Sequence, residues 1–352
     1  MSLPVHLVGS IGLDTVDDVF AACGELLGPY LKRVPDGEPG GRRLWISWQF
    51  PLLRASPFLK ADVSTHRAGG VGFHPLMVAE GVNPEDVRFG ELGYAREARA
   101  SYLDFVAARD NGVLPSNVRF QVCLPTPFAV VAPFVAENSR DAVLRAYEAA
   151  MLREVAAVCA GIPHHDLALQ WDVCIEMVMW DGRWRGGPPF PGMEKVFADT
   201  FARLAAAVSG NVELGFHLCY GDLDARHFVE PVDMTKMVEL ANLIAASAQR
   251  PIAWMHMPVP IARDDDAFFR PLRKLHLDAG TELYLGLVHA EDGLAGAQRR
   301  IAAARKFAGR SFGVASECGI ARGRTPARVR QFLEVYAAAA AGRLCGSGRR
   351  PR

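Results

Sequence analysis

The sequence lacks several features that would assign it to other classes of protein. No uninterrupted apolar run approaches the roughly 20 residues of a membrane-spanning helix, and no basic region followed by a long apolar run opens the chain. Neither sign of charge prevails, because 39 Lys and Arg balance 39 Asp and Glu. We therefore expect a cytoplasmic protein whose partners are small molecules, with no nucleic acid and no membrane among them.

Cysteine is sparse and scattered. The seven cysteines in 352 residues are an odd number, without the dense spacing of a small disulfide-stapled secreted domain. We interpret four of them, Cys23, Cys123, Cys159 and Cys174, as packed core thiols, and Cys345 as an incidental residue of the tail. Cys219 and Cys318 remain as candidates for binding a metal.

Short apolar or β-branched runs alternate with longer stretches of helical periodicity, a pattern typical of a parallel sheet covered by helices. The eight runs are residues 5–8, 70–73, 118–124, 167–172, 212–218, 252–256, 283–289 and 312–317. The clearest helical stretches are residues 139–160, 193–208, 234–247, 294–308 and 325–341. The pattern predicts an α/β protein, a single-domain (β/α)8 TIM barrel over residues 1–341, followed by a flexible tail at 342–352. Residues 29–59 fit neither pattern and suggest a lid or substrate loop.

Polar side chains fall at the ends of these runs, where barrel enzymes carry their catalytic groups. His217 and Cys219 are two residues apart on one strand and so point to the same side. Cys318, at the end of the eighth run, is a third candidate. Zinc prefers cysteine and histidine ligands, and a three-residue site leaves one position for a substrate. A catalytic zinc site is one interpretation, and ordinary packing of these residues in the core is the other.

Six segments resemble the catalytic domain of cobalamin-independent methionine synthase, a family among the uroporphyrinogen decarboxylase and methionine synthase-like barrels. They occur in the family's order along nearly the whole chain. The matching segments are LVGSIGL at 7–13, DGEPGGRRLW at 36–45, CLPTPF at 123–128, LQWDV at 169–173, GFHLCYGD at 215–222 and ASECGIARGR at 315–324.

The resemblance implies a chemistry and a cofactor. It implies that His217, Cys219 and Cys318 bind Zn²⁺, and that a thiol substrate such as homocysteine binds the zinc as thiolate and accepts a methyl or alkyl group. The expected partners are therefore a small-molecule thiol and a methyl donor. The sequence leaves the identity of both, and the oligomeric state, open.

The resemblance also implies roles for residues around the metal. Ser10, Glu38 and Asp172 match positions that hold the amino acid end of homocysteine. Asp172 and His289 are the expected catalytic residues, and His289 matches a histidine that assists as an acid near the methyl donor.

The sequence departs from the family at three places. The family's fourth zinc ligand is a glutamate, where this chain offers His256, which either ligates the zinc or leaves it with three protein ligands. Asp172 is followed by Val-Cys where the family has Glu-Pro, and Glu176 is a candidate for the missing carboxylate. Enzymes of the family that take the methyl group from folate carry an additional N-terminal barrel that this sequence does not show, so we do not expect a folate donor.

Two other functions remain open on the same barrel. One is a decarboxylase, or a lyase or hydrolase that uses zinc as a Lewis acid. A metal-free decarboxylase would need arginines at the mouth of the barrel, for which Arg33, Arg42 and Arg43 are candidates. The other is a non-catalytic binding or metal-storage module, which the concentration of titratable residues at the strand ends disfavours.

Overall fold

The computed structural model describes residues 2–64, 73–184, 190–222 and 226–342. Their strands are β1 (Arg33–Pro35), β2 (Leu59–Ala61), β3 (Leu76–Val78), β4 (Arg119–Pro125), β5 (Leu167–Val173), β6 (Glu213–Leu218), β7 (Trp254–Pro258), β8 (Glu282–Gly286) and β9 (Gly313–Val314). Their α-helices are α1 (Val16–Leu27), α2 (Phe50–Arg54), α3 (Tyr94–Asp110), α4 (Pro127–Phe134), α5 (Arg140–Gly161), α6 (Ile175–Trp180), α7 (Met193–Ala206), α8 (Thr235–Ser247), α9 (Asp266–Phe269), α10 (Gly293–Arg305) and α11 (Pro326–Ala340). None of these helices combines the length and the apolarity needed to span a membrane.

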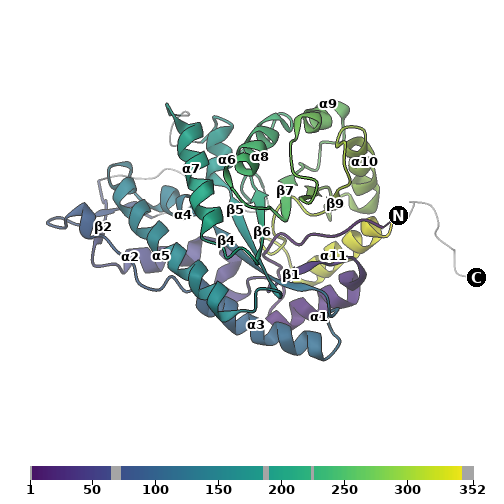
Figure 1. The fold of residues 1–352 in the computed structure, drawn as a ribbon, viewed down its shortest axis with the longest axis horizontal. Coiled ribbons are helices and arrows are strands. Elements are labelled where there is room, and N and C mark those ends of the chain that lie inside the picture. The colour runs from purple at the N-terminus through teal and green to yellow at the C-terminus, as the bar shows by residue number, and fades with distance from the viewer. Residues whose placement is uncertain (1, 65–72, 185–189, 223–225, 343–352) are drawn as a thin grey trace, which may run out of the picture.

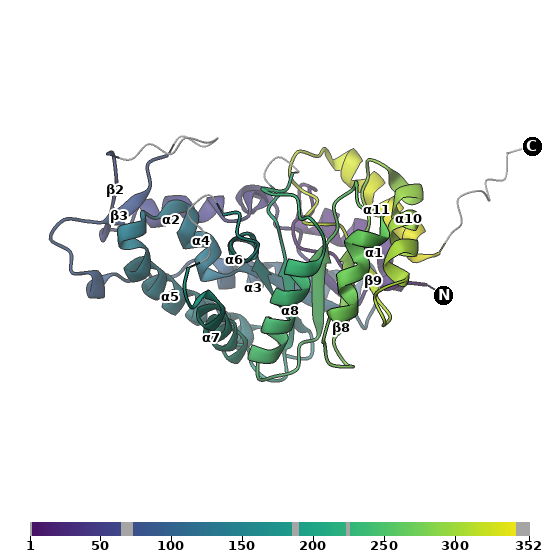
Figure 2. The ribbon, with the colours of Figure 1, turned by 90° about the horizontal axis from the view of Figure 1, so that it is seen from above.

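Seven strands form one parallel sheet in the order β1-β4-β5-β6-β7-β8-β9. The sheet curls, and the helices pack around it (Figure 1). Between β1 and β9, no further strand completes the ladder within the described residues. Instead Val5 makes single parallel bridges to Leu31, just before β1, and to Val314 in β9. The fold is thus α/β and TIM-like, with a seven-stranded ladder. Strands β2 and β3 form a separate antiparallel pair, at the end of the molecule opposite α10 and α11 (Figure 2).

Six of the eight predicted runs are confirmed as strands of this sheet, because residues 118–124, 167–172, 212–218, 252–256, 283–289 and 312–317 overlap β4 to β9. Residues 5–8 lie next to the sheet but make only the bridges of Val5. The run 70–73 lies outside the described residues except for Phe73, which belongs to no strand. The predicted tail likewise lies outside them, apart from Gly342, so its flexibility stays a prediction.

The sequence failed to predict the short pair β2 and β3 and, in the main sheet, β1, which lies inside the segment 29–59 suggested as a lid. Its three residues contain an arginine and a proline and therefore give no apolar run. The buried Arg33 side chain is stabilised instead by ion pairs, from Nε to Glu213 at 2.5 Å and from Nη1 to Glu282 at 2.8 Å. Its guanidinium also lies 4.3 Å from the ring centroid of Trp254. These contacts join the start of β1 to the N-terminal ends of β6, β7 and β8.

The five predicted helices are confirmed as α5, α7, α8, α10 and α11, with bounds that differ by at most three residues. Several helices begin at the residues expected of caps. Thr15 and Asp18 form a reciprocal capping box at α1, and Thr325 caps α11 ahead of a proline in its first turn. Local sequence therefore determines where these helices begin, and burial of their apolar faces against the sheet stabilises them.

The interior of the sheet contains a polar network centred on Gln170 in β5. Its side-chain oxygen accepts hydrogen bonds from His6 Nε2 at 2.8 Å and Trp254 Nε1 at 3.2 Å. Its amide nitrogen donates to the Val8 carbonyl at 2.6 Å and to Asp172 Oδ1 at 2.8 Å. The network ties the N-terminal segment to β5 and β7, and it fixes the carboxyl of Asp172.

Trp254 fits into this interior only because β6 carries a glycine beside it. A Cβ at Gly215 would lie 1.9 Å from Trp254 Cε2, closer than any real contact, so Gly215→Ala forces the indole to move in a densely packed core. We expect this substitution to lower the free energy of unfolding by about 1–3 kcal/mol. Urea denaturation measures the change, with Gly210→Ala as the control, since its Cβ meets nothing within 4 Å. Equal stability of the two variants would contradict this packing.

Candidate metal centre

Three neighbouring strands bring the polar residues of the site into one row. The parallel register pairs Asp172 of β5 with His217 of β6, and His217 with His256 of β7. Asp172 and His217 lie one residue before the C-terminal ends of their strands, which is where barrel folds place active sites, and His256 lies in the middle of β7. Cys219 continues the pairing beyond β6, because its N–H donates to the Val173 carbonyl at 3.0 Å.

The loop after β9 carries Cys318 to the same place. Ser316 Oγ donates to the Cys318 carbonyl at 2.5 Å, and Tyr336 of α11 donates from its hydroxyl to Ser316 Oγ at 2.8 Å. The next residue is a glycine that lies close against the N-terminal segment, since a Cβ at Gly319 would lie 2.1 Å from Ser10 Oγ. The N-terminal segment and α11 together therefore fix the position of Cys318.

His217, Cys219 and Cys318 form a buried cluster whose ligand atoms all lie within 4.8 Å of one another. The two sulfurs are 3.5 Å apart, and Cys318 Sγ is 3.8 Å from His217 Nε2. Zinc binds sulfur at about 2.3 Å and nitrogen at about 2.0 Å, so tetrahedral ligands are separated by roughly 3.5–3.8 Å. The donor types and their spacing both fit a zinc ion with a fourth position left over.

His256 contacts this cluster through His217. Its Nε2 lies 3.0 Å from the Ser316 carbonyl, which only accepts, so Nε2 carries the hydrogen. Burial lowers the pKa of His256 to about 3, so its other nitrogen, Nδ1, is an acceptor. Nδ1 lies 2.6 Å from His217 Nδ1, which must then donate. The arrangement leaves the lone pair of His217 on Nε2, facing Cys318. Since both nitrogens of His256 are already engaged in hydrogen bonds, it favours the alternative in which the metal has three protein ligands.

An arginine and an aspartate adjoin the cluster, and the sequence analysis did not single them out. Arg322 Nη2 lies 3.5 Å from Cys318 Sγ, and the same guanidinium binds Asp222 Oδ2 from Nη2 at 2.7 Å and from Nε at 3.1 Å. The available signal was spacing, since Arg322 follows Cys318 by four residues and Asp222 follows Cys219 by three. Neither spacing marks a ligand by itself.

Glu38 lies on a strained turn at the edge of the site. It has a φ of 53°, which is uncommon outside glycine, and its N–H donates to Asp36 Oδ1 at 2.9 Å. Its Oε1 is close to the N-terminal segment, 3.2 Å from where a Cβ on Gly9 would be. Burial, and then the charge of Asp36, raises the pKa of Glu38 from 4.5 to about 7.

Asp172 lies within electrostatic reach of Glu38. Burial raises the pKa of Asp172 well above its usual value, and the charge of Glu38 raises it further, while the hydrogen bond from Gln170 lowers it. Ser10 lies beside Gly319 in the Cys318 loop. The structure thus places the three expected substrate-binding residues around the cysteine and histidine cluster, on three different segments.

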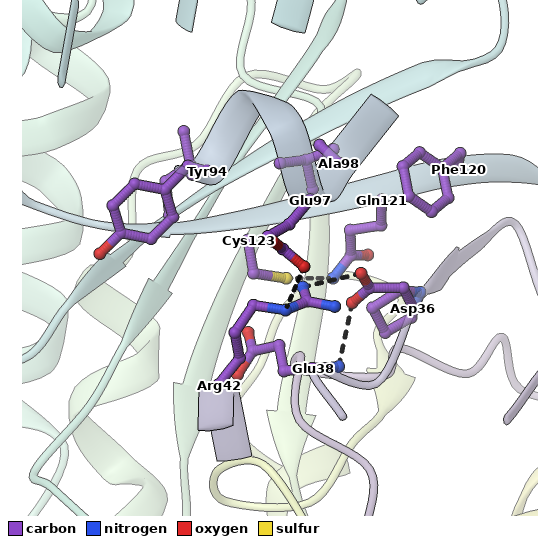
Figure 3. Close-up of a pocket in the computed structure, with 12 residues that line it drawn as sticks. Asp36, Glu38, Arg42, Tyr94, Glu97, Ala98, Phe120, Gln121 and Cys123 are labelled. Carbon is purple, nitrogen blue, oxygen red and sulfur yellow. Dashed lines mark hydrogen bonds and ion pairs between the residues drawn. The ribbon is translucent and has the colours of Figure 1, made fainter. Parts of the chain in front are cut away.

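A small cavity lies behind Glu38, between β1, β4 and α3. Figure 3 shows the Asp36 carboxylate facing the Arg42 guanidinium and the backbone nitrogen of Glu38, and Arg42 Nη1 donates to Asp36 Oδ2 at 2.8 Å. Its volume of about 30 Å³ is enough for one or two water molecules and too small for a substrate. A cavity of about 250 Å³ between the N-terminal ends of β6 and β7 lies at the opposite end of the sheet from the cluster.

His289 does not belong to the metal cluster. Its Nε2 lies 2.9 Å from the Val259 carbonyl and so carries the hydrogen, and its Nδ1 is 4.0 Å from Glu317 Oε1. Burial, and then the charge of Arg300, lowers the pKa of His289 to about 3. Burial raises the pKa of Glu317 to about 7. Its other carboxyl oxygen, Oε2, lies closer to His227 Nε2, at 3.3 Å, so Glu317, the chain neighbour of Cys318, lies between two histidines, a position that the sequence analysis missed.

The remaining candidates lie apart from the cluster. Glu176 is buried in α6, where burial raises its pKa to about 7, and it is not among the ligand group formed by the described residues. Arg33 is paired at the N-terminal end of the sheet, Arg42 is paired with Asp36, and Arg43 with Asp14. The three arginines proposed for a decarboxylase are thus already engaged.

The curled parallel α/β fold of this chain is similar to that of solved structures. One similar structure is a B12-independent methionine synthase from Shewanella sp. W3-18-1 in complex with selenomethionine, with a TM-score of 0.61, 13% identity and coverage of 97% of each chain. Another is a putative vitamin-B12-independent methionine synthase from Listeria monocytogenes, with the same TM-score and identity over 97% of this chain and 98% of that one. At this identity the likeness establishes the fold.

No protein-family model matches the chain, and no curated protein is significantly similar to it in sequence.

The raised pKa of Glu38 predicts a pH-dependent effect on stability. The folded chain holds the proton up to about pH 7 and the unfolded chain only to about 4.5, so the cost of burying the carboxylate is absent below pH 4.5 and complete above pH 7. We expect Glu38→Gln to raise the free energy of unfolding on the order of 2 kcal/mol at pH 8, and by progressively less towards pH 5. Chemical denaturation at both pH values tests this, with the exposed Glu91→Gln as control. A gain that does not change with pH would argue against it.

Proposed function

We propose that this protein is a zinc-dependent enzyme that transfers a methyl or other alkyl group between a small-molecule donor and a thiol. The observation that carries the proposal is the buried cluster of His217, Cys219 and Cys318, whose spacing suits tetrahedral zinc. The likeness in fold to the two methionine synthase structures supports a related chemistry.

Zinc at this cluster would bind a thiol as thiolate and so supply a strong nucleophile at neutral pH. With neutral His217 and two thiolates, the ion's two positive charges are balanced, and the fourth position is open to a substrate sulfur. The role proposed for His256 is to hold the imidazole of His217 in the tautomer that presents Nε2.

The substrate groups proposed around the metal come from separate segments. Glu38 and Asp172 offer carboxyl groups to the amine of an amino acid thiol such as homocysteine, and Ser10 offers a hydroxyl. His289, with its N–H held by a carbonyl, is proposed to act near the donor, and Glu317, whose Oε1 lies 4.0 Å from His289 Nδ1, is proposed to supply its proton. Burial raises the pKa of Glu317 to about 7, so a substantial fraction of this carboxyl carries a proton at neutral pH.

The principal alternative is a decarboxylase, or a lyase or hydrolase using zinc as a Lewis acid. The decarboxylase has less support, because its candidate arginines are engaged in ion pairs. A lyase or hydrolase would share the metal ligands and differ in having water or a carbonyl at the open position.

Metal analysis tests the proposal directly. After zinc reconstitution we expect about one zinc per chain, with two sulfur ligands in its X-ray absorption spectrum and a third on addition of homocysteine. Cys219→Ser and Cys318→Ser should each lose stoichiometric zinc, whereas Cys159→Ser in α5 should retain it. Full metal content in the first two variants would show that the assigned cluster is wrong. Bound zinc that gains no sulfur from the thiol would favour the lyase or hydrolase.

A second measurement separates the two roles open to His256. If it acts through His217, His256→Ala keeps two sulfurs and one nitrogen around the zinc but weakens zinc affinity by roughly 10- to 100-fold. His256→Gln, which retains an acceptor for the His217 N–H, should recover part of the affinity. Competition with a chromophoric chelator gives the affinities. The loss of one nitrogen from the absorption spectrum of His256→Ala would identify His256 as a ligand instead.

A further inference from the structure

The two cysteines of the cluster are themselves possible targets of the proposed reaction. A thiolate bound to zinc remains a nucleophile, and Cys219 and Cys318 would share the ion with the substrate sulfur. A methyl donor that enters the site could therefore alkylate a ligand of the metal in place of the substrate. In that side reaction an S–C bond forms at the cysteine, the bond between the methyl group and the donor breaks, and the donor leaves with the electron pair.

Cys318 accepts a hydrogen bond from a side chain that is held firmly for this contact. Arg322 Nη2 lies 3.5 Å from Cys318 Sγ and 2.7 Å from Asp222 Oδ2, so one of its two hydrogens is available for each acceptor. Nε of the same guanidinium donates to Asp222 Oδ2 at 3.1 Å and to the Asp222 carbonyl at 2.8 Å. Three contacts to one residue fix the plane of the guanidinium and direct Nη2 at the sulfur.

Cys219 accepts its hydrogen bond from the backbone of its own loop. The nitrogen of Gly221 lies 3.2 Å from Cys219 Sγ and donates to it. This turn suits glycine, because Gly221 has a φ of 88° and a Cβ there would lie 2.5 Å from the ring of Phe228. The protein thus supplies an N–H donor to each of the two sulfurs.

The surroundings strengthen these hydrogen bonds. The side chains of Arg322 and Asp222 are only 13% and 4% exposed, and both cysteines are buried. A charge-assisted hydrogen bond is stronger where water is excluded. A donor to a thiolate stabilises the lone pair that would attack an electrophile, and nucleophilicity falls as the lone pair is stabilised. The sulfur can still bind a metal, as ligands with outer hydrogen bonds commonly do.

We propose that Arg322 protects Cys318 from alkylation by donating a hydrogen bond to its thiolate, so that the alkyl group goes to the substrate sulfur and not to the metal ligand. Asp222 contributes by orienting Arg322, and both are positioning residues. This inference rests on the proposed function and extends it to the choice between the sulfurs on the metal.

The test uses iodomethane as a small electrophile on the zinc-loaded full-length protein, and peptide mass spectrometry gives the methylation rate of each cysteine. Arg322→Met keeps a side chain of similar length without a donor. We expect its Cys318 to be methylated roughly 10-fold faster than in the parent, the lower end of the effect of a hydrogen bond to a charged group. Cys219 keeps its bond from Gly221 and should change little. Arg322→Lys, which retains a cationic donor, should restore part of the protection.

Cobalt substitution gives a readout that does not depend on access to the sulfur. Loss of the hydrogen bond raises the energy of the sulfur lone pair, so the sulfur-to-cobalt charge-transfer band of Arg322→Met should move to lower energy, and that of Arg322→Lys should lie between it and the parent. Arg330→Gln removes a positive charge from the exposed side of α11 and should leave the band and both methylation rates unchanged.

An unchanged rate at Cys318 would overturn this inference. So would an equal acceleration at both cysteines, which would mean only that the site had become more open. If Arg322→Met loses its zinc because Asp222 is left buried without a cation, the double variant with Asp222→Asn removes that charge and takes its place. Loss of zinc there too would show that Arg322 only holds the two loops together, and the inference would be wrong.

Each of these negative results leaves the proposed function intact. The proposed function fails instead if the parent protein binds no zinc at the cluster, or if its zinc gains no sulfur ligand from a thiol.

Discussion

The site depends on one chain of hydrogen bonds between buried, neutral groups. The Ser316 carbonyl can only accept, and this fixes the proton on His256, which in turn fixes the proton on His217 and leaves one lone pair directed at the two thiols. The chain exists because parallel register places His217 and His256 opposite each other on β6 and β7. A shift of either strand by one residue would turn its imidazole to the other face of the sheet and separate the pair.

Around this chain the protein maintains features that cost stability. Glu38 combines a left-handed backbone with a buried carboxyl, and Asp172 is a second buried carboxyl within its reach. Such features persist where the surrounding structure holds them firmly, and they concentrate at functional sites. Here the Gln170 network restrains Asp172, and the turn through Asp36 restrains Glu38. The buried carboxyls that lower the stability of the fold are therefore the same groups that we propose bind the substrate.

Sequence patterns predicted the parts of this fold that repeat a strong local signal. Strands β4 to β8 are apolar runs, and the two-residue spacing of His217 and Cys219 correctly implied a shared face, which the cluster geometry confirms. The short β1 gave no signal, because it has no apolar run. Ion pairs of Arg33 stabilise it instead. The tautomer of His256 depends on the Ser316 carbonyl, which is distant in sequence. The proximity of Arg322 to Cys318 depends on the conformation of the loop that carries both. Local periodicity carries no information about either.

The contacts of the Cys318 loop also constrain when the site can form during synthesis. Ser10 lies against Gly319, and Val5 pairs with Val314, so these two contacts cannot form until more than 300 residues have followed the start of the chain. His217 and Cys219 leave the ribosome about 100 residues before Cys318, and at that stage only two of the three ligands exist. Contacts of such long sequence separation form late in folding. The nascent chain therefore exposes an incomplete thiol and imidazole pair, and the complete cluster becomes available to a metal only in the last stage of folding.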